Sequence, residues 1–211
     1  MTLREELVGK AAELVPVLWE RAAKTEQLRR IPQETVEDFH ASGLMRIAQP
    51  KRFGGLGLDF DHVLDVAAEL ARGCGSAGWC YAIWASHNWL MGMFSEQAQV
   101  EYWAQSANTL SSTSFNPKGA QVTQTEGGYR LSGHWDFSSD CDEASWVILH
   151  GNGPQGLLYI LVPKQEYRIE DTWFVAGLRG TGSKDLVVDN AFVPEYRVVP
   201  AVELQDANSP G

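Results

Sequence analysis

The sequence lacks any run of 18 or more apolar residues, so no segment is predicted to cross a membrane as a helix. Basic residues are also scarce, with 17 Lys and Arg against 27 Asp and Glu and a formal net charge of −10. Because nucleic acids and anionic membrane surfaces are bound by basic patches, we expect neither as a partner. The N-terminus begins as an amphipathic helix without the apolar core of a secretory signal, and we expect a cytoplasmic protein.

Cysteine is rare as well. The three cysteines, Cys74, Cys80 and Cys141, form no CxxC pair, and their number is odd. This pattern argues against a disulfide framework and against a zinc site, so we expect no metal. We interpret all three as small buried apolar side chains in a reducing compartment.

The first half of the chain has the period of helices. Thr2 and Glu5 have the spacing of a capping box, apolar residues then recur on one helical face, and Gly43 is a typical helix end. Residues 76–94 carry apolar side chains on all faces, which predicts a buried helix. We therefore predict an all-helical domain over residues 1–108.

Beyond residue 108 the period changes to the alternation of strands. Gly127 and Gly128 punctuate a predicted hairpin, and further short apolar runs are separated by glycine and proline. We predict an antiparallel β-barrel domain over residues 109–202 and a linker or tail over residues 203–211. The predicted fold class is α+β, with several domains.

The stretch with the most chemistry is residues 133–146, which read GHWDFSSDCDEASW. Ser138 and Ser139 fall where a predicted strand ends, and Trp135 and Trp146 bracket them. Aromatic walls beside hydroxyl groups suit a flat heteroaromatic ligand such as a flavin. The alternative is a sheet corner with packed tryptophans and a solvated acidic turn formed by Asp140, Asp142 and Glu143.

Four segments in this order resemble one known family. They are GCGSAGW at 73–79, SHNW at 86–89, the stretch at 133–146, and GLRGTGSKDLVVDNAFVP at 177–194. They are similar to the oxygenase components of two-component flavin-dependent aromatic monooxygenases, which have the acyl-CoA dehydrogenase fold. The likeness is strongest to hydroxylases of steroid A-ring and 4-hydroxyphenylacetate degradation, and it covers almost all of the chain.

The resemblance implies hydroxylation of a phenolic or related aromatic substrate by O2 through a C4a-hydroperoxyflavin. The cofactor implied is reduced FMN, with reduced FAD as the alternative, delivered by a separate NAD(P)H:flavin reductase. The family also implies a homo-oligomer, a tetramer. Protein groups in such a site exclude water and hold the cofactor in place.

The resemblance also assigns residues. Two catalytic residues are implied, His87 beside the phenol and Ser138 at flavin N5. The implied flavin-binding residues are Trp79, Thr113, Ser114, Phe115, Phe137, Ser138 and Ser139. For His87 the alternative is a satisfied core histidine.

The chain departs from the family pattern at this site. It has Phe137 and Asp140 where tryptophan and glycine are common, and one additional residue before Pro117. A glycine would suit a positive φ, which aspartate tolerates only moderately.

Two other functions remain open. An acyl-CoA dehydrogenase with bound FAD is disfavoured because residues 110–121, LSSTSFNPKGAQ, lack that family's TEP-like and AGSD segments. A non-catalytic, degenerate member is the other alternative. Family members continue into a C-terminal four-helix bundle that this chain lacks, so we expect a truncated oxygenase, one chain of a split enzyme, or a degenerate protein.

Overall fold

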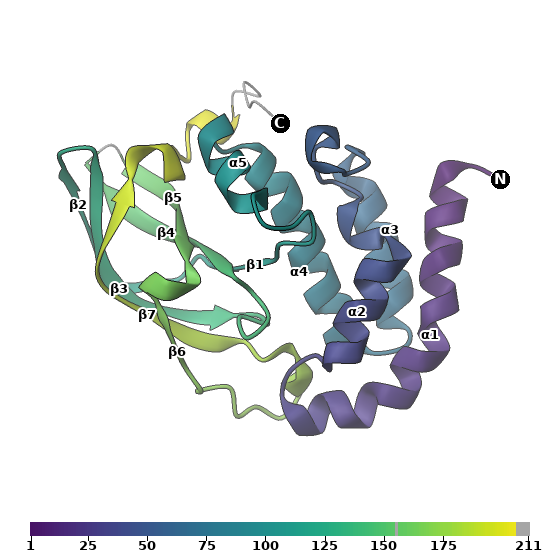
Figure 1. Ribbon diagram of the computed structural model, residues 1–211. Helices are drawn as coiled ribbons and strands as arrows, with labels where there is room; N and C mark the ends of the chain where they lie inside the picture. The colour runs from purple at the N-terminus through teal and green to yellow at the C-terminus, as the bar shows by residue number, and fades with distance from the viewer. Residues whose placement is uncertain (155, 206–211) are drawn as a thin grey trace. The chain divides into compact units, whose positions relative to one another are not determined.

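The computed structural model describes residues 1–154 and 156–205, which form two compact units (Figure 1). The helical unit comprises Met1–Trp89 and Phe174–Gly182, and the sheet unit comprises the described residues of Leu90–Trp173 and from Ser183 onward. Residues 206–211 of the predicted tail lie outside the described residues. The helical and β regions occur in the predicted order, whereas the boundaries at 108 and 202 stay a prediction.

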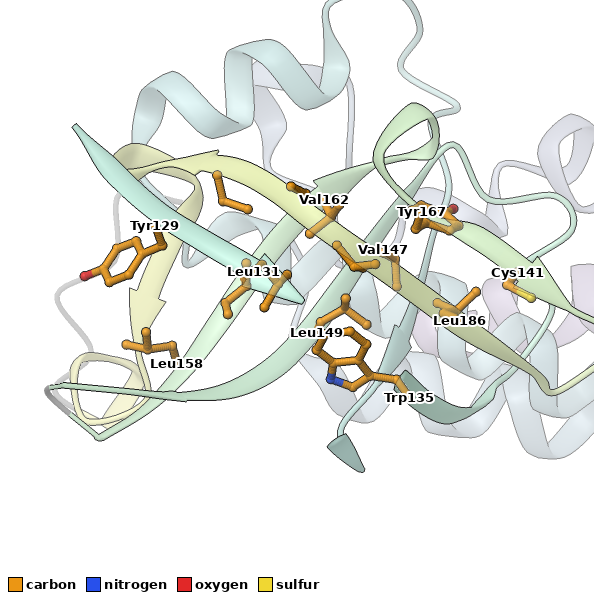
Figure 2. Close-up of a cluster of buried hydrophobic side chains, with 14 residues drawn as sticks. Tyr129, Leu131, Trp135, Cys141, Val147, Leu149, Leu158, Val162, Tyr167 and Leu186 are labelled. Atoms are coloured by element: carbon orange, nitrogen blue, oxygen red, sulfur yellow. The ribbon is translucent and has the colours of Figure 1, made fainter. Parts of the chain in front are cut away.

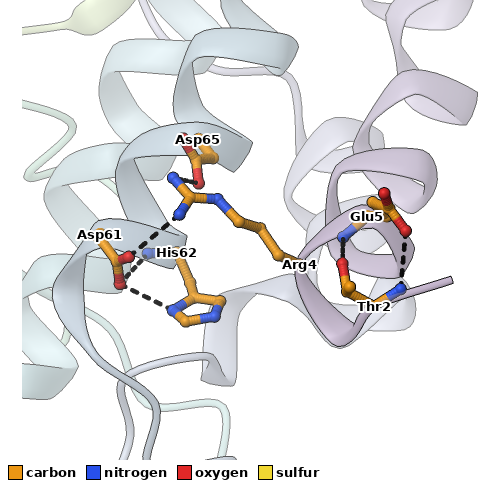
Figure 3. A network of polar contacts seen from close by, with 6 residues as sticks. All are labelled: Thr2, Arg4, Glu5, Asp61, His62 and Asp65. Atoms are coloured by element: carbon orange, nitrogen blue, oxygen red, sulfur yellow. Dashed lines mark hydrogen bonds and ion pairs between the residues drawn. The ribbon is translucent and has the colours of Figure 1, made fainter.

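The helical unit is built from α1 (Leu3–Leu28), α2 (Gln33–Ser42), α3 (Phe60–Ala71) and most of α4 (Gly75–Gly92). The predicted capping box is confirmed, because Thr2 Oγ1 accepts from the Glu5 amide and the Glu5 carboxylate accepts from the Thr2 amide. Figure 3 shows how Arg4, which lies between the two capping-box residues, connects α1 to α3 through Asp61 and Asp65. In the part of the chain that the structure describes, no helix combines the length and apolar character needed to cross a bilayer.

Helix α4 is packed on most of its surface, as the sequence predicts. Tyr81 and Trp84 are fully buried, whereas Trp79 keeps 49% and Trp89 42% of its surface exposed. The prediction that apolar residues are buried on all faces is therefore wrong for these two side chains. A half-exposed indole on an otherwise buried helix is available to a ligand or to another part of the protein.

The sheet unit contains α5 (Glu96–Trp103) and two four-stranded sheets. One sheet has the order β1-β4-β5-β8 and the other β2-β3-β7-β6. Their bounds are β1 Ser111–Ser114, β2 Pro117–Thr125, β3 Gly128–Ser138, β4 Trp146–Gly153, β5 Gly156–Pro163, β6 Arg168–Glu170, β7 Lys184–Pro194 and β8 Val198–Pro200. Neighbouring strands are antiparallel, as predicted, except that β1 and β4 are parallel.

Both sheets contribute to one apolar core (Figure 2). Leu131 and Trp135 come from β3, Leu149 from β4 and Leu186 from β7, and all four are fully buried. The indole nitrogen of Trp135 donates to the carbonyl of His150 over 2.8 Å, so its one polar atom is satisfied. Trp135 thereby fixes the C-terminal part of β3 immediately before Ser138.

All three cysteines are buried and unpaired with one another, as the sequence predicts. Burial raises the pKa of the Cys141 thiol to about 12, which makes this side chain an inert packing group.

Candidate functional site

The candidate site in the sheet unit is the corner where β3 ends. Ser138 is the last residue of β3 and is fully buried, yet its hydroxyl oxygen has no hydrogen-bond partner among the described residues. The next hydroxyl, that of Ser139, is hydrogen-bonded to the Ser183 hydroxyl over 2.9 Å. Since a buried polar atom without a partner is costly, the Ser138 hydroxyl is a candidate ligand contact.

The backbone on both sides of these serines is in the left-handed region. Phe137 has φ of 59° and Asp140 has φ of 47°. The pairing of β3 with β7 is also shifted between Trp135 and Ser138, so the strand bulges before it ends. A left-handed conformation costs an L-residue roughly 1–2 kcal/mol, and such strain concentrates at functional sites.

The bulge turns Phe137 outward. Its side chain is 59% exposed, and its ring meets the edge of Trp173 with centroids 6.0 Å apart. This places an aromatic ring at the surface, one residue before the buried Ser138. An aromatic face beside a hydroxyl is the combination that the sequence predicts for a flat heteroaromatic ligand.

The end of β1 lies against the same corner. The Ser114 hydroxyl donates to the carbonyl of Asp136, so Ser114 holds the bulged backbone of β3 in place. The following residue, Phe115, stacks on His150 with centroids 4.0 Å and planes 19° apart. Thr113 is half-buried on β1, in register with Ile148 of β4. The structure thus brings the two predicted segments, 113–115 and 137–139, together within one unit.

His150 is a neutral partner for that stack. Burial lowers the pKa of its imidazole, and the backbone carbonyl of Phe115 opposes this effect in part. The ring also meets the edge of Tyr159 at 4.3 Å. The sequence gives no sign that His150 belongs to this corner. Its partners, Phe115 after β1 and Tyr159 on β5, are brought to it only by strand pairing.

The acidic turn after Ser139 differs from its prediction. Asp140 is fully buried, and Asp142 accepts from the Lys184 ammonium through both oxygens, at 2.7 and 3.0 Å. The alternative of a solvated turn is therefore wrong for Asp140 and Asp142. A lysine about forty positions away along the chain neutralises an acid that the sequence pattern places in water.

The other two predicted residues belong to the helical unit. Trp79 and His87 both lie on α4, Trp79 half-exposed and His87 buried. The side-chain amide of Asn88, next to His87, donates to the Met45 carbonyl over 2.8 Å. The structure brings neither residue together with the sheet-unit residues within a single unit, and their roles remain predictions.

A second polar cluster of the sheet unit surrounds His134. His134 bonds Asp185 over 2.8 Å, and Asp136 pairs with Lys118 at 2.5 Å. The possible ligand atoms of His134, Asp136 and Asp185 lie within 4.8 Å of one another, as in a metal site. Oxygens of both carboxylates already contact cationic or donor groups, however, so we interpret the cluster as a charge network joining β2, β3 and β7.

Known proteins match the chain in sequence and in structure. Residues 4–108 match the family model described as "Acyl-CoA dehydrogenase, N-terminal domain". The chain is 40% identical to the oxygenase subunit HsaA of a flavin-dependent monooxygenase from Rhodococcus jostii, over 94% of this chain and 53% of that protein. It is 37% identical to the oxygenase component of an FADH2-dependent resorcinol hydroxylase from a Rhizobium species, over 97% of this chain and 51% of that protein.

The crystal structure of the HsaA monooxygenase from Mycobacterium tuberculosis matches the fold with a TM-score of 0.94 at 36% identity. That match covers 98% of this chain and 55% of the other, so the chain spans about half the length of the relatives it matches. Sequence, order of elements and fold agree along almost the whole chain. The chain therefore has the acyl-CoA dehydrogenase fold and is similar along almost its whole length to oxygenase components of flavin-dependent monooxygenases.

Proposed function

We propose that this chain forms part of a reduced-flavin-dependent oxygenase that hydroxylates a phenolic or related aromatic substrate. The observation that carries the proposal is the buried, unpartnered hydroxyl of Ser138 at a strained corner flanked by exposed aromatic side chains. Relatives with 40% and 37% identity are named as oxygenase components of flavin-dependent enzymes, which supports the same assignment.

The residues of the sheet unit fit a flavin. Phe115 and Phe137 offer exposed aromatic surface, and the Ser138 hydroxyl offers a donor and acceptor that no described residue uses. Ser114 has a different part, because its hydroxyl is already bonded to the Asp136 carbonyl and so supports the corner from β1. Trp79 of the helical unit is assigned to the cofactor by its place in the family pattern and by its half-exposed indole.

A bound reduced flavin would supply the two electrons with which O2 inserts one oxygen atom into the aromatic ring and forms water with the other. The chain's own residues have the tasks of orientation and water exclusion. Ser138 would hold the ring nitrogen at N5 through its hydroxyl, and the aromatic side chains would cover the ring faces.

His87 is proposed to hold the phenol of the substrate. A neutral imidazole nitrogen can accept the phenolic proton, which makes the ring carbon a better nucleophile. Its burial on α4 suits this task, because a proton acceptor shielded from water keeps the phenolate for the reaction. The substrate would then reach the protein beside α4.

The relatives' names as oxygenase components or subunits imply a second protein that reduces the flavin. We propose a separate NAD(P)H:flavin reductase as that partner. We also propose a homo-oligomer, a tetramer as in the family, with reduced FMN as the cofactor and reduced FAD as the alternative.

The test uses the full protein, purified and titrated without oxygen against reduced FMN and reduced FAD. Oxygen enriched in ¹⁸O is then added with resorcinol or 4-hydroxyphenylacetate as a probe phenol. We expect saturable binding of one reduced flavin and a product that gains one ¹⁸O atom. Absence of binding by either reduced flavin, or a product without ¹⁸O, would contradict the proposed function.

A further inference from the structure

We propose that Ser183 and Lys184, at the start of β7, are positioning residues that hold the Ser138–Ser139 corner in the shape that binds the flavin. This inference rests on the proposed function of that corner. Both lie in the segment 177–194 that resembles the family, but neither is among the site residues that the resemblance assigns. Both act through other residues, Ser183 through Ser139 and Lys184 through Asp142.

The corner requires external support because its backbone is strained on both sides. Phe137 and Asp140 both have positive φ, and neither is a glycine. Residues in such conformations persist only where the surrounding structure over-determines them. The contacts that could do this must come from elements other than β3 itself, since β3 ends at Ser138.

The start of β7 supplies these contacts from directly beside the corner. Lys184 is the register partner of Ser138 in the pairing of β3 with β7. One residue earlier, the Ser183 hydroxyl bonds the Ser139 hydroxyl, and both side chains are buried. Ser138 is therefore matched by the first residue of β7, and Ser139 by the residue immediately before that strand.

Lys184 also fixes the turn that follows. Its ammonium reaches both oxygens of Asp142, and the two side chains are only 13% and 15% exposed. A second lysine, Lys164, donates to the carbonyl of Cys141 over 2.9 Å. Because a pair shielded from water is weakly screened, the bond to Asp142 restrains the turn much more than a surface ion pair would.

These bonds leave the Ser138 hydroxyl free of protein partners while they occupy its neighbours. Ser139 is bonded to Ser183, and Asp142 to Lys184, whereas Ser138 has no partner among the described residues. A corner held in this way keeps one hydroxyl ready for a ligand without rearrangement. Binding then requires little further ordering of the backbone, which favours affinity.

The experiment measures the dissociation constant of reduced FMN, and the free energy of unfolding, in the full protein and four variants. Ser183→Ala removes the bond to Ser139, and Lys184→Met removes the pair with Asp142. Lys184→Arg keeps the charge and should restore binding. Arg197→Met is the matched control, because Arg197 pairs with Glu101 in the same unit and is also 13% exposed in its side chain.

We expect Ser183→Ala and Lys184→Met to weaken reduced-FMN binding at least about tenfold, as side chains that orient a ligand-contacting group typically do. They should also raise the fraction of O2 that is released as hydrogen peroxide, because a loosened corner admits water. Arg197→Met should lower stability without changing the dissociation constant, and Lys184→Arg should bind within about threefold of the parent, since the ion pair is kept.

If the parent protein binds reduced FMN and both Ser183→Ala and Lys184→Met bind it equally well, the positioning role is overturned while the proposed function stands. Equal weakening in Arg197→Met would overturn the positioning role too, because the effect would then follow general stability. If the parent protein binds no reduced flavin, the proposed function fails and the positioning role fails with it. If Lys184→Met does not fold, Ser183→Ala decides the question, because it removes a single hydroxyl.

Discussion

The contact between α3 and α4 depends on the absence of a side chain at Gly78. A Cβ built there would lie 2.7 Å from the backbone nitrogen, Cα and Cβ of Ala71, and real Cβ contacts are essentially never that short. Gly9 on α1 is different, because an added Cβ would meet nothing within 4 Å. The two glycines therefore predict opposite responses to the same substitution.

The magnitudes follow from helix propensity and packing. Replacing a helical glycine by alanine favours the helix by roughly 0.5–1 kcal/mol, and Gly9→Ala should gain this amount. Gly78→Ala gains the same amount, but forcing an additional methyl group into a packed contact costs about 1–3 kcal/mol. Because the clash is with backbone atoms that cannot turn away, we expect a net loss of about 1–2 kcal/mol.

Urea unfolding of the full protein, followed by circular dichroism at the helix band, measures both variants against the parent. We expect the midpoint to rise for Gly9→Ala and to fall for Gly78→Ala. Since Gly78 precedes Trp79, Gly78→Ala should also weaken reduced-flavin binding, whereas Gly9→Ala should leave it unchanged. A stabilised Gly78→Ala variant would refute the close approach of the two helices.

Three further predictions concern the site. Trp79→Ala should weaken reduced-flavin binding, measured by titration, by roughly 2 kcal/mol, which is the free energy expected when a ligand buries about half of an indole side chain. Trp89→Ala, on the same helix, should leave reduced-flavin binding unchanged. His87→Ala should bind the flavin normally but form hydroxylated phenol at least about a hundredfold more slowly, as expected for loss of a general base, and a normal rate would exclude that role. Burial lowers the pKa of His150 below that of the unfolded chain, so its stabilising contribution is present above pH of about 6.5 and is lost as the pH falls through the folded pKa. Between pH 7 and 5, His150→Gln should therefore lose less unfolding free energy than the parent, and an equal loss would contradict the burial of that imidazole.

Local signals predicted the ends of several elements. Thr2 caps α1 together with Glu5, and Gly43 ends α2 with φ of 76°. Each of these rests on contacts within four residues, which sequence spacing alone can specify.

The candidate site could be predicted only in part, because its second half is not local. The family pattern identifies Ser138 and Ser139, but Ser183 lies 44 positions from Ser139, and Lys184 lies 42 positions from Asp142. Neither pair can be recognised before the pairing of β3 with β7 is known. A local sequence pattern predicts that a charged side chain such as Asp142 is exposed to solvent. Only the folded structure brings Lys184 to it as an ion-pair partner.

Phe137 and Asp140 show why local preference fails at this corner in particular. An aromatic residue and an acid stand in left-handed conformations that glycine or asparagine would adopt at lower cost. If the corner had no function, nothing would be lost by relaxing its backbone. Instead it is held by the mostly shielded ion pair of Lys184 with Asp142 and by the buried hydroxyl bond of Ser183 with Ser139. The strain and the contacts that maintain it are both explained if the shape itself is required, with Phe137 turned outward and the Ser138 hydroxyl left for a ligand. Relaxing the corner should therefore impair binding more than stability.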